Sequence, residues 1–287
     1  MNFDTLLPVL LSPWGLGILG LCVGSFLNVV IHRLPMMMER QWRAEGAEAL
    51  NVPLPTEDSQ PLTLSKPASR CPHCGHAIRW YENIPLISWL VLRGKCSSCQ
   101  APISVRYPLI ELLTGALFVA CWWRFGEHPN TLLWCGFIAV LVAAAAIDWD
   151  TTLLPDSLTQ PLLWAGLVVA VLGWGSVSMR DAIWGAVAGY LSLWSVYWLF
   201  KLTTGKEGMG YGDFKLLAAL GAWLGWSMIL PIVLGSSLIG AIVGIALKLS
   251  ANLREGRYVP YGPFLAGAGL CVMLAGRDQV LSWLGWM

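Results

Sequence analysis

The chain has 287 residues, of which 56% are hydrophobic and only 12% are charged, and its formal net charge is +1. This charged share is about half that of an ordinary soluble domain, so the chain has too few polar residues to cover itself in water and is expected to lie in a lipid bilayer. The near-zero net charge argues against a nucleic-acid partner, which would need a concentrated basic surface.

Apolar runs along the chain predict an all-α polytopic membrane protein with about eight transmembrane helices. A helix needs roughly 20 residues to cross the hydrocarbon core of a bilayer. Pro8 and Pro13 predict a kinked start to the first run. The chain begins without the basic segment of a cleaved signal peptide, so we expect this run to be retained. The expected spans are residues 6–31, 109–123, 131–147, 158–174 and 182–202, two within 214–249 that flank a turn near 225–227, and 264–286.

The distribution of lysine and arginine predicts the orientation of these spans, because basic loops stay on the cytoplasmic side of a membrane. With eight spans, all of the 18 basic residues except Arg124, Arg180 and Arg277 fall in loops on one side. Both termini are therefore expected to face outward. Asp148 and Asp213 are then expected at the same cytoplasmic boundary, where they could meet.

The loop between the first two spans, residues 34–107, is the candidate cytoplasmic domain. Its early part, 36–66, is polar, contains proline and acidic residues, and is expected to be poorly structured. Residues 84–92 are apolar but too short to span the membrane. We expect them to lie in the membrane interface or to pack on the rest of the loop.

Two Cys-x-x-Cys pairs in this loop predict a zinc site. Each short turn presents two sulfurs, and four thiolates suit a tetrahedral ion with a structural role, since no position is left open for water. A cytoplasmic loop argues against two disulfides, and reduced free thiols are the other alternative. The expected ligands are Cys71, Cys74, Cys96 and Cys99. The cysteines expected to lie singly in apolar spans, as small hydrophobic residues, are Cys22, Cys121, Cys135 and Cys271.

Asp148 and Asp213 are the strongest indication of chemistry, because each places a carboxylate at the edge of a long apolar run, where an ionised group is costly. Asp148 ends the third span, and the C-terminal end of a helix disfavours an anion, so another group must compensate its charge. Asp150 is the alternative to Asp148. Asp213 follows Gly210 and Gly212, and glycines allow another backbone to come close.

Simpler roles are available to two of the aspartates. Asp213 precedes an apolar helix and could be only its N-cap, a common position for aspartate. Asp156 precedes the fourth span in the same way, and for Asp156 we prefer the N-cap role.

Two carboxylates a few ångströms apart cannot easily both ionise, so one keeps a proton while the other acts as a base. Such a pair activates water for attack on an amide, which is aspartic-protease chemistry. The four histidines form no Ser-His or Cys-His arrangement with a plausible partner, and the metalloprotease motif His-Glu-x-x-His is absent from the sequence. Two other classes compete. A proton-coupled transporter would place its carboxylates near the midplane of the membrane, and a zinc-bearing membrane scaffold would explain the cysteines but not the paired aspartates.

Several motifs lie far apart along the chain. They are GSFLNVVIHRLP at 24–35, RYPLIE at 106–111, the segment 147–156 that runs from Ile-Asp to Leu-Pro-Asp, Gly-Tyr-Gly-Asp at 210–213, and the two cysteine pairs. Together they resemble the bacterial type IV prepilin peptidases over nearly the whole chain. The resemblance implies an aspartic endopeptidase of the Gly-x-Gly-Asp kind in the bacterial inner membrane. Such enzymes cut the short basic leader from type IV prepilins and type II secretion pseudopilins, after a glycine, at the cytoplasmic face.

The resemblance also implies roles for individual residues. Asp148 and Asp213 would be the catalytic pair. The residues expected to support them are Gly210, Gly212, Asp150 and Asp156. The expected parts of the chain are a first transmembrane helix at 1–33, the zinc-bearing cytoplasmic loop at 34–107, and a seven-helix membrane peptidase domain at 108–287.

Members of the family commonly also methylate the new N-terminal residue with S-adenosylmethionine, and the resemblance links this activity to the cytoplasmic loop. Glu82, Arg106 and Glu111 are candidates for methyl transfer or substrate binding, because they are polar groups near the membrane. Their alternative role is pairing at the membrane interface.

Overall fold

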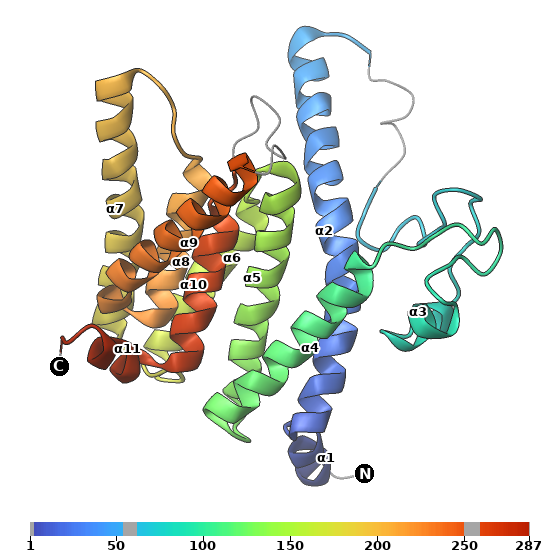
Figure 1. The fold of residues 1–287 in the computed structure, drawn as a ribbon, viewed down its shortest axis with the longest axis horizontal. Coiled ribbons are helices and arrows are strands. Elements are labelled where there is room, and N and C mark those ends of the chain that lie inside the picture. Colours follow the sequence, from blue (N-terminus) through green and yellow to red (C-terminus); the bar gives the residue numbers. More distant parts are fainter. Residues whose placement is uncertain (1–2, 54–61, 250–258, 287) are drawn as a thin grey trace. The chain divides into compact units, whose positions relative to one another are not determined.

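The computed structural model describes residues 3–53, 62–249 and 259–286, which form helices joined by loops (Figure 1). Strand pairing in this part of the chain is limited to two isolated bridges, Arg70 with Ala77 and Lys95 with Pro102. The predicted all-α fold class is therefore confirmed. The helices are α1 (Phe3–Leu10), α2 (Pro13–Leu50), η2 (Trp80–Asn83), α3 (Ile87–Val91), α4 (Arg106–Phe125), α5 (Thr131–Thr151), α6 (Asp156–Val171), α7 (Met179–Thr204), α8 (Tyr211–Leu224), η3 (Trp226–Met228), α9 (Ile229–Leu249), α10 (Gly262–Ala275) and α11 (Arg277–Trp283).

Five helices of the described chain are long and apolar enough to cross a membrane, and α10 with α11, bent by 102°, makes a sixth candidate. Each of the eight expected spans has a helical counterpart. However, α6 has 16 residues, and α8 and α10 have 14 each, fewer than the roughly 20 that cross a bilayer core. Length and composition thus support five or six spans rather than about eight. The five are Pro13–Leu50, Arg106–Phe125, Asn130–Thr151, Met179–Thr204 and Trp226–Leu249.

Turns divide the apolar runs close to where the sequence indicates. The expected kink at the start is a break between α1 and α2, where the Ser12 hydroxyl accepts a hydrogen bond from the Gly15 N–H at 3.1 Å. The expected turn near 225–227 is centred on Gly225, whose φ of 86° is rarely adopted by residues with a side chain. That conformation ends α8 and allows α9 to follow η3.

The expectation that residues 36–66 are poorly structured is wrong for their first part, because α2 continues to Leu50. Residues 36–50 are rich in Met, Glu, Gln, Arg and Ala, which favour helix. Pairs one turn apart add to this, since Arg43 Nη2 donates to Glu39 Oε1 at 2.6 Å. The helix ends at Asn51, a left-handed C-cap with φ 52°. Residues 54–61 of the expected loop lie outside the described residues.

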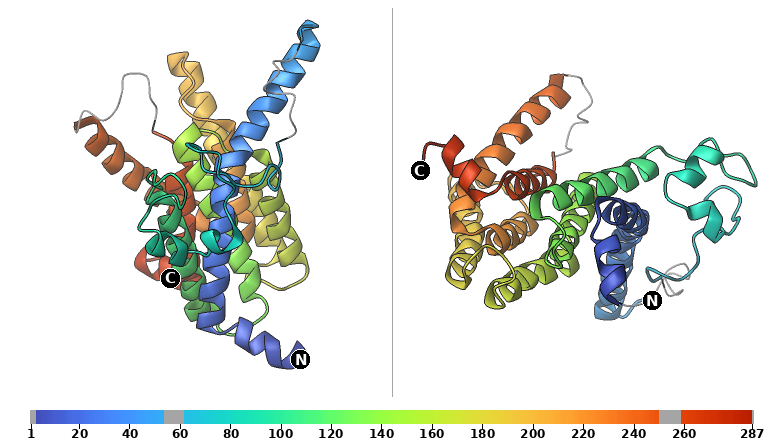
Figure 2. Two further views of the ribbon diagram at one scale, coloured as in Figure 1. Left: turned by 90° about the vertical axis from the view of Figure 1, so that its right-hand side faces the viewer. Right: turned by 90° about the horizontal axis from the view of Figure 1, so that it is seen from below.

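The chain divides into two compact units, Met1–Ala143 and Ala144–Met287, and the division falls inside α5. In the first unit, α2 packs along α4 through glycines. A Cβ added to Gly20 would lie 2.8 Å from the Cα of Gly115, and one added to Gly24 would lie 2.7 Å from the Cα of Glu111. Such close approach is typical of membrane helices. The segment between α2 and α4, teal in Figures 1 and 2, extends away from this pair and carries both cysteine pairs.

In the second unit, α8 is surrounded by other helices, and from Asp213 to Leu224 every residue except Lys215 is buried. A Cβ on Gly189 of α7 would lie 2.5 Å from the carbonyl oxygen of Leu217 in α8. On the α6 side, the indole N–H of Trp223 donates to the Leu162 carbonyl at 2.8 Å. This packing fixes the first turn of α8, and with it Asp213.

Two of the four cysteines expected to lie singly are in fact neighbours. The thiols of Cys121 in α4 and Cys135 in α5 are within hydrogen-bonding reach of each other, and Cys121 also donates to the Thr131 carbonyl at 3.6 Å. Both are buried, so their role as small hydrophobic residues stands. Sequence spacing gave no sign of this contact, because it depends on how α4 and α5 pack.

Candidate active site

Asp148 and Asp213 line one cavity of about 470 Å³ in the second unit. The end of α5, the segment after it, the start of α8 and the segment before α10 form its walls. The two aspartates are 5% and 7% exposed, so both carboxylates are held largely away from solvent. The described lining consists of Asp148, Asp150, Thr151, Thr152, Leu154, Glu207, Gly208, Met209, Gly210, Gly212, Asp213, Val259, Pro260 and Tyr261.

Asp148 lies in the last turn of α5, and the group that compensates its charge is the start of α10. The backbone N–H of Gly262, the first residue of α10, donates to Asp148 Oδ2 at 2.9 Å. The N-terminal end of a helix carries partial positive charge, which offsets the unfavourable C-terminal end of α5. The compensation that the sequence required is therefore present.

Gly262 and Tyr261 are site residues that the sequence reasoning missed. A Cβ added to Gly262 would lie 2.6 Å from Asp148 Oδ2, so a side chain there would displace the carboxylate. The hydroxyl of Tyr261 is within hydrogen-bonding distance of Ser236 at 2.7 Å and Ser237 at 3.0 Å, both on α9. The available signal was the Gly-Pro pair ahead of an apolar run, since proline in the first turn marks the start of a helix.

Asp213 is the third residue of α8, and the N-cap position belongs to Gly210. The alternative that Asp213 is only an N-cap is therefore wrong. Its Oδ1 is buried and has no hydrogen-bond partner among the described residues, which is costly for a polar atom unless water or a ligand supplies the bond. The charge of Asp148 acts on the Asp213 carboxyl, so the two groups are electrostatic neighbours in this cavity.

The two glycines before Asp213 have different surroundings. A Cβ on Gly212 would lie 2.6 Å from the Cβ of Leu154, so this glycine is required for close packing of α8 on the segment after α5. At Gly210 the nearest such contact is Asp213 Oδ2 at 3.9 Å, which is ordinary van der Waals distance. Gly210 therefore leaves room beside Asp213, whereas the space at Gly212 is filled.

The other two aspartates differ from the buried pair. Asp150 lines the same cavity but its side chain is exposed. Asp156 is absent from the described lining and is not the N-cap that we preferred, because Pro155 occupies that position. Its carboxylate instead accepts from Lys215 Nζ at 2.7 and 2.8 Å. This pair joins the first residue of α6 to the fifth residue of α8.

The four loop cysteines form a cluster whose sulfur atoms all lie within 4.8 Å of one another. Across the pairs, Cys71 Sγ lies 3.8 Å from Cys99 Sγ, and Cys74 Sγ lies 4.0 Å from Cys96 Sγ. Four sulfurs at about 2.3 Å from a central zinc ion would be separated by about 3.8 Å, whereas a disulfide requires about 2.05 Å. The donor set and its spacing fit zinc and exclude disulfides here.

The two cysteine turns share one backbone pattern. Gly75 N–H donates to the Cys71 carbonyl at 2.9 Å, and Gln100 N–H donates to the Cys96 carbonyl at 3.1 Å. Hydrogen bonds from the N–H groups of Cys74 and His73 lower the pKa of Cys71 to about 7. The corresponding bonds from the second turn lower the pKa of Cys96. Each turn therefore favours the thiolate form of its first cysteine, which is the form that a zinc ion requires.

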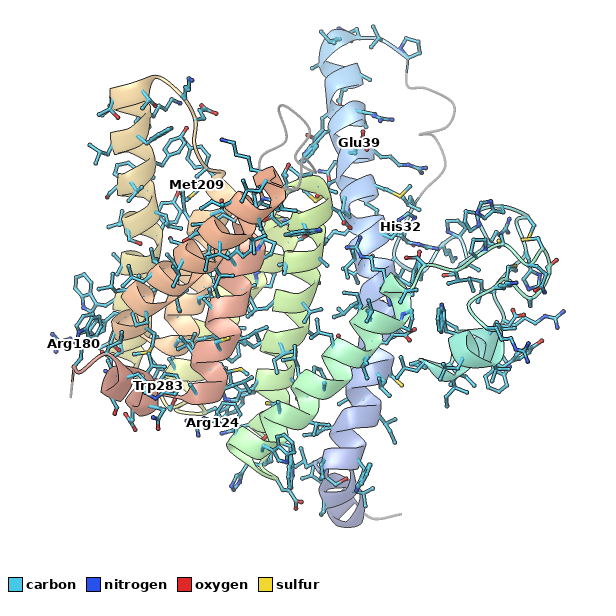
Figure 3. All side chains as sticks on the ribbon, viewed as in Figure 1. His32, Glu39, Arg124, Arg180, Met209 and Trp283 are labelled. Carbon is cyan, nitrogen blue, oxygen red and sulfur yellow. The ribbon has the colours of Figure 1, made fainter. Side chains whose placement is uncertain are left out.

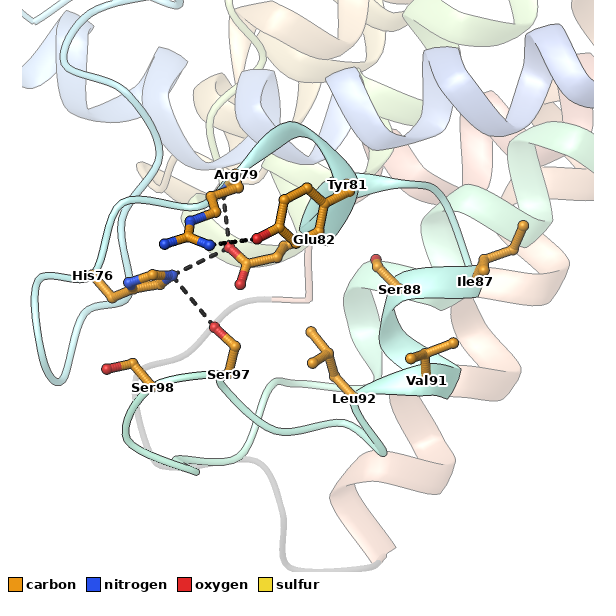
Figure 4. A pocket seen from close by; sticks show the side chains of 10 residues that line it. All are labelled: His76, Arg79, Tyr81, Glu82, Ile87, Ser88, Val91, Leu92, Ser97 and Ser98. Atoms are coloured by element: carbon orange, nitrogen blue, oxygen red, sulfur yellow. Dashed lines mark hydrogen bonds and ion pairs between the residues drawn. The ribbon is translucent and has the colours of Figure 1, made fainter.

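The structure separates the three candidates for methyl transfer. Glu82 lines a cavity of the cysteine-bearing segment, where its Oε2 accepts from the Arg79 N–H at 2.8 Å (Figure 4). Glu111 is buried in α4 and accepts from the Leu86 N–H at 2.9 Å. Arg106 begins α4, is exposed, and is absent from the described lining of that cavity. Glu82 thus holds the residue before η2, whereas Glu111 holds Leu86, the residue before α3.

Comparison with known proteins covers both units. Residues 18–125 match the bacterial peptidase A24 N-terminal domain, and residues 135–245 match the type IV leader peptidase family. A prepilin leader peptidase/N-methyltransferase from Aeromonas hydrophila is 56% identical over 263 residues, which are 92% of this chain and 90% of that protein. The chain belongs to the type IV leader peptidase family.

Other relatives carry the same name over the same extent. One from Stutzerimonas stutzeri is 53% identical over 93% of this chain and 92% of its own length. One from Pseudomonas aeruginosa is 54% identical over 92% of this chain and 90% of its own length. No solved structure matches the chain. The resemblance drawn from the motifs is confirmed, and the chain is a multi-pass membrane protein of this family.

Proposed function

We propose that this chain is a membrane aspartic endopeptidase that removes the leader from type IV prepilins and type II secretion pseudopilins, and that it then methylates the new N-terminus. The observation that carries the peptidase assignment is the shared cavity of Asp148 and Asp213. These two carboxylates come from helices 65 residues apart in sequence, and both are buried beside a glycine-rich turn.

The two aspartates divide the proton transfers of peptide hydrolysis between them. The Gly262 N–H stabilises negative charge on Asp148, so we assign Asp148 as the base that takes a proton from water. Asp213 carries the proton and delivers it to the departing amide nitrogen. The water oxygen bonds to the carbonyl carbon, and the bond between that carbon and the nitrogen breaks. The room beside Gly210 admits the extended substrate backbone.

The charge of the cavity suits a basic leader. Its described lining contains four acidic side chains, those of Asp148, Asp150, Glu207 and Asp213, and no lysine or arginine. Glu207 is itself held by Lys201 Nζ at 2.8 Å, which fixes the segment before α8. An acidic cavity raises the local concentration of a positively charged peptide, and we infer cleavage after a glycine between this leader and the apolar helix of the substrate.

The cavity end of the second unit carries more basic residues than the other end, which supports a cytoplasmic active site. Four lysines, Lys201, Lys206, Lys215 and Lys248, lie near the end of α7, the start of α8 or the end of α9, whereas Arg180 and Arg277 belong to the first turns of α7 and α11. Figure 3 shows Arg180 and Trp283 at the opposite end of this unit from Met209, which lines the cavity. With basic residues retained inside, the cavity opens toward the cytoplasm of a bacterial inner membrane.

The position of the cavity also weighs against a transporter. Asp148 lies in the last turn of α5 and Asp213 in the first turn of α8. A substrate site for alternating access would be expected near the middle of the helices.

Replacement of each aspartate tests the peptidase assignment. Asp148→Asn and Asp213→Asn should each lower the rate of prepilin cleavage on the order of a thousandfold, because each removes one of the two proton transfers. Asp150→Asn is the matched control and should cut within a few-fold of the unaltered protein. The measurement is cleavage of a purified prepilin by protein in detergent, followed by mass. Full activity of folded Asp213→Asn protein would overturn the assignment.

Methyl transfer is the second proposed activity, with S-adenosylmethionine as the methyl donor and zinc as a structural ion on the four cysteines. Its support is the cysteine cluster together with the N-methyltransferase in the names of the relatives. A substrate that has already been cut separates the two activities. Asp213→Asn protein should transfer a labelled methyl group to this substrate although it cannot cleave the uncut prepilin.

A further inference from the structure

A cavity of about 630 Å³ lies within the cysteine-bearing segment of the first unit, and the proposed peptide hydrolysis does not use it (Figure 4). Its volume is in the range of small-molecule sites. One wall contains Glu82 with Arg79 and Tyr81, the second contains α3, and the third is the second cysteine turn at Ser97 and Ser98. The chemistry of these walls determines which class of ligand the cavity could bind.

Glu82 supplies a fixed negative charge to the cavity. Its side chain is 10% exposed, and Oε2 lies 2.8 Å from the Arg79 N–H and 3.2 Å from His76 Nε2. The hydrogen bonds from the Arg79 N–H and the Ser97 hydroxyl lower the pKa of Glu82 to about 2. The contacts with the Arg79 N–H and His76 Nε2 both use Oε2. The charge of the Arg79 guanidinium also acts on Glu82, and its Nη1 donates to the Tyr81 hydroxyl at 2.6 Å.

The opposite wall is apolar although it is open to solvent. Ile87 and Val91 of α3 line the cavity with 59% and 74% of their surface exposed. Exposed aliphatic side chains around a concave site favour a ligand with an apolar body. A charged carboxylate facing such a surface favours a ligand that is also cationic.

The apolar wall is held in a strained conformation by a residue outside the cavity. Leu86, which precedes α3, has φ 59° and ψ −48°, an unusual backbone conformation for a residue with a side chain. Its N–H donates to Glu111 Oε2 at 2.9 Å, and Glu111 is buried in α4. Strain of this kind persists where surrounding contacts enforce it, and it is concentrated at functional sites. Glu111 therefore positions α3 as the apolar wall.

We propose that this cavity binds an organic cation with an apolar body, with Glu82 as its counter-ion and α3 as its apolar surface. The inference rests on the proposed methyltransferase activity, which uses two organic cations. One is the sulfonium of S-adenosylmethionine. The other is the free α-amino group that cleavage exposes on an apolar peptide.

Matched ligand pairs that differ in charge test the role of Glu82. The first pair is S-adenosylmethionine and S-adenosylhomocysteine, which lacks the sulfonium charge. The second pair is one apolar hexapeptide with a free or an acetylated N-terminus. Each is titrated by calorimetry into the zinc-loaded full chain in detergent, and zinc content is measured for every variant.

The charged member of one pair should bind on the order of tenfold more tightly, as expected for a charge-assisted contact. Glu82→Gln should remove this preference, because it keeps an acceptor for the Arg79 N–H but loses the charge. Glu48→Gln, an exposed charge on α2, should retain it. The pair that shows the preference identifies the ligand. Absence of a preference in both pairs, or its survival in Glu82→Gln, would overturn the inference.

A second variant tests the apolar wall. Val91→Arg adds a long cationic side chain at an exposed position of α3 and should abolish binding, whereas Val52→Arg at another exposed position should not. Unchanged binding by Val91→Arg would also overturn the inference. The same preparations are assayed for cleavage and methyl transfer. If the unaltered protein transfers the methyl group but ligand binding does not depend on Glu82, this site alone is rejected. If the unaltered protein neither cuts nor methylates, the proposed function is rejected.

Discussion

The Gly262 amide reaches the Asp148 carboxylate because Gly262 has no side chain. The N–H lies 2.9 Å from Asp148 Oδ2, and a Cβ would lie 2.6 Å from the same oxygen. Burial of a carboxylate at the C-terminal end of a helix is unfavourable on two counts, desolvation and the helix dipole. The start of α10 offsets both with one directed hydrogen bond and a dipole of opposite sense. A single backbone group thus makes the position of Asp148 possible.

We expect Gly262→Ala to lower the rate of prepilin cleavage at least a hundredfold, which is the effect expected from a misplacement of about 1 Å in a catalytic group. The new methyl group would push the Asp148 carboxylate away from both the amide and Asp213. The measurement is single-turnover cleavage of a purified prepilin by the variant in detergent.

Gly267→Ala is the matched control, because it lies in the same helix and an added Cβ would meet no described atom within 4 Å. This control should keep the cleavage rate of the unaltered protein, and both variants should keep its helix content. Normal cleavage by Gly262→Ala would show that Asp148 does not need this contact.

At the scale of elements, an ion pair between Asp156 and Lys215 joins the start of α6 to α8. Lys215 lies two residues after Asp213 in α8. Its side chains are 61% and 27% exposed, so solvent screens the attraction. We interpret the pair as a minor aid to helix packing and not as part of the proton transfers. Burial of the rest of α8 is the larger contribution to the position of Asp213.

We expect the double-mutant cycle of Asp156→Asn and Lys215→Met to give a coupling of roughly 0.2–1 kcal/mol in the free energy of unfolding. Cleavage by each single variant should stay within a few-fold of the unaltered protein, because neither residue touches the reacting atoms. Thermal unfolding and prepilin cleavage measure the two quantities. A loss of cleavage as large as that expected for Asp213→Asn would instead place Asp156 in the chemistry.

The cysteine turns are the second element whose role can be tested. Their two hairpins are short, and of the four cysteines only Cys71 and Cys96 are buried. A zinc ion that links the turns would supply the stabilisation that so small a core lacks.

We expect Cys71→Ser combined with Cys74→Ser to lower bound zinc from about one ion per chain to none, because two sulfurs do not complete a tetrahedral site. Limited proteolysis within residues 62–105 should become at least about tenfold faster as the turns separate. Cys22→Ser, an exposed cysteine of α2, is the control and should change neither quantity. Proteolysis that is equally slow without zinc would refute a structural role for the metal.

At the scale of the whole molecule, the proposed orientation follows from the charges at the two ends of the second unit. Lys206 lies in the segment before α8, and Arg180 lies in the first turn of α7. Lys201 and Lys248 in the last turns of α7 and α9 join Lys206 at the cavity end, whereas only Arg277 in the first turn of α11 joins Arg180. The cavity end is thus the end that the charge rule retains in the cytoplasm.

We expect single cysteines at these two positions to react from opposite sides of the membrane. In a background without the exposed cysteines Cys22, Cys74, Cys99 and Cys271, Lys206→Cys should be labelled by a membrane-impermeant maleimide only in inverted inner-membrane vesicles. Arg180→Cys should be labelled only in intact spheroplasts. The reverse pattern would place the active site outside the cytoplasm. Labelling of both positions from one side would contradict a single crossing of the membrane by α7, which separates Arg180 from Lys206.

Much of this molecule could be predicted from the sequence, because the relevant signals are local. Apolar runs mark the positions of the helices, and the spacing of Cys71 with Cys74 brings two sulfurs to one side of a turn whatever surrounds it. Composition alone misled the prediction at residues 36–50, where polar side chains were taken as a sign of disorder. The same residues favour helix, and they continue α2 to Leu50.

The sequence by itself determined that Asp148 and Asp213 are costly charges at the ends of apolar helices, and that Asp148 needs a compensating group. Only the tertiary structure decided which group this is. Gly262 lies 114 residues from Asp148, and nothing in its own neighbourhood marks it as a partner. The sequence also did not indicate that Gly212 packs against Leu154 or that Glu111 accepts a hydrogen bond from Leu86. The physical reason is that these contacts depend on how separate helices pack, whereas hydrophobicity and motif spacing describe each segment alone.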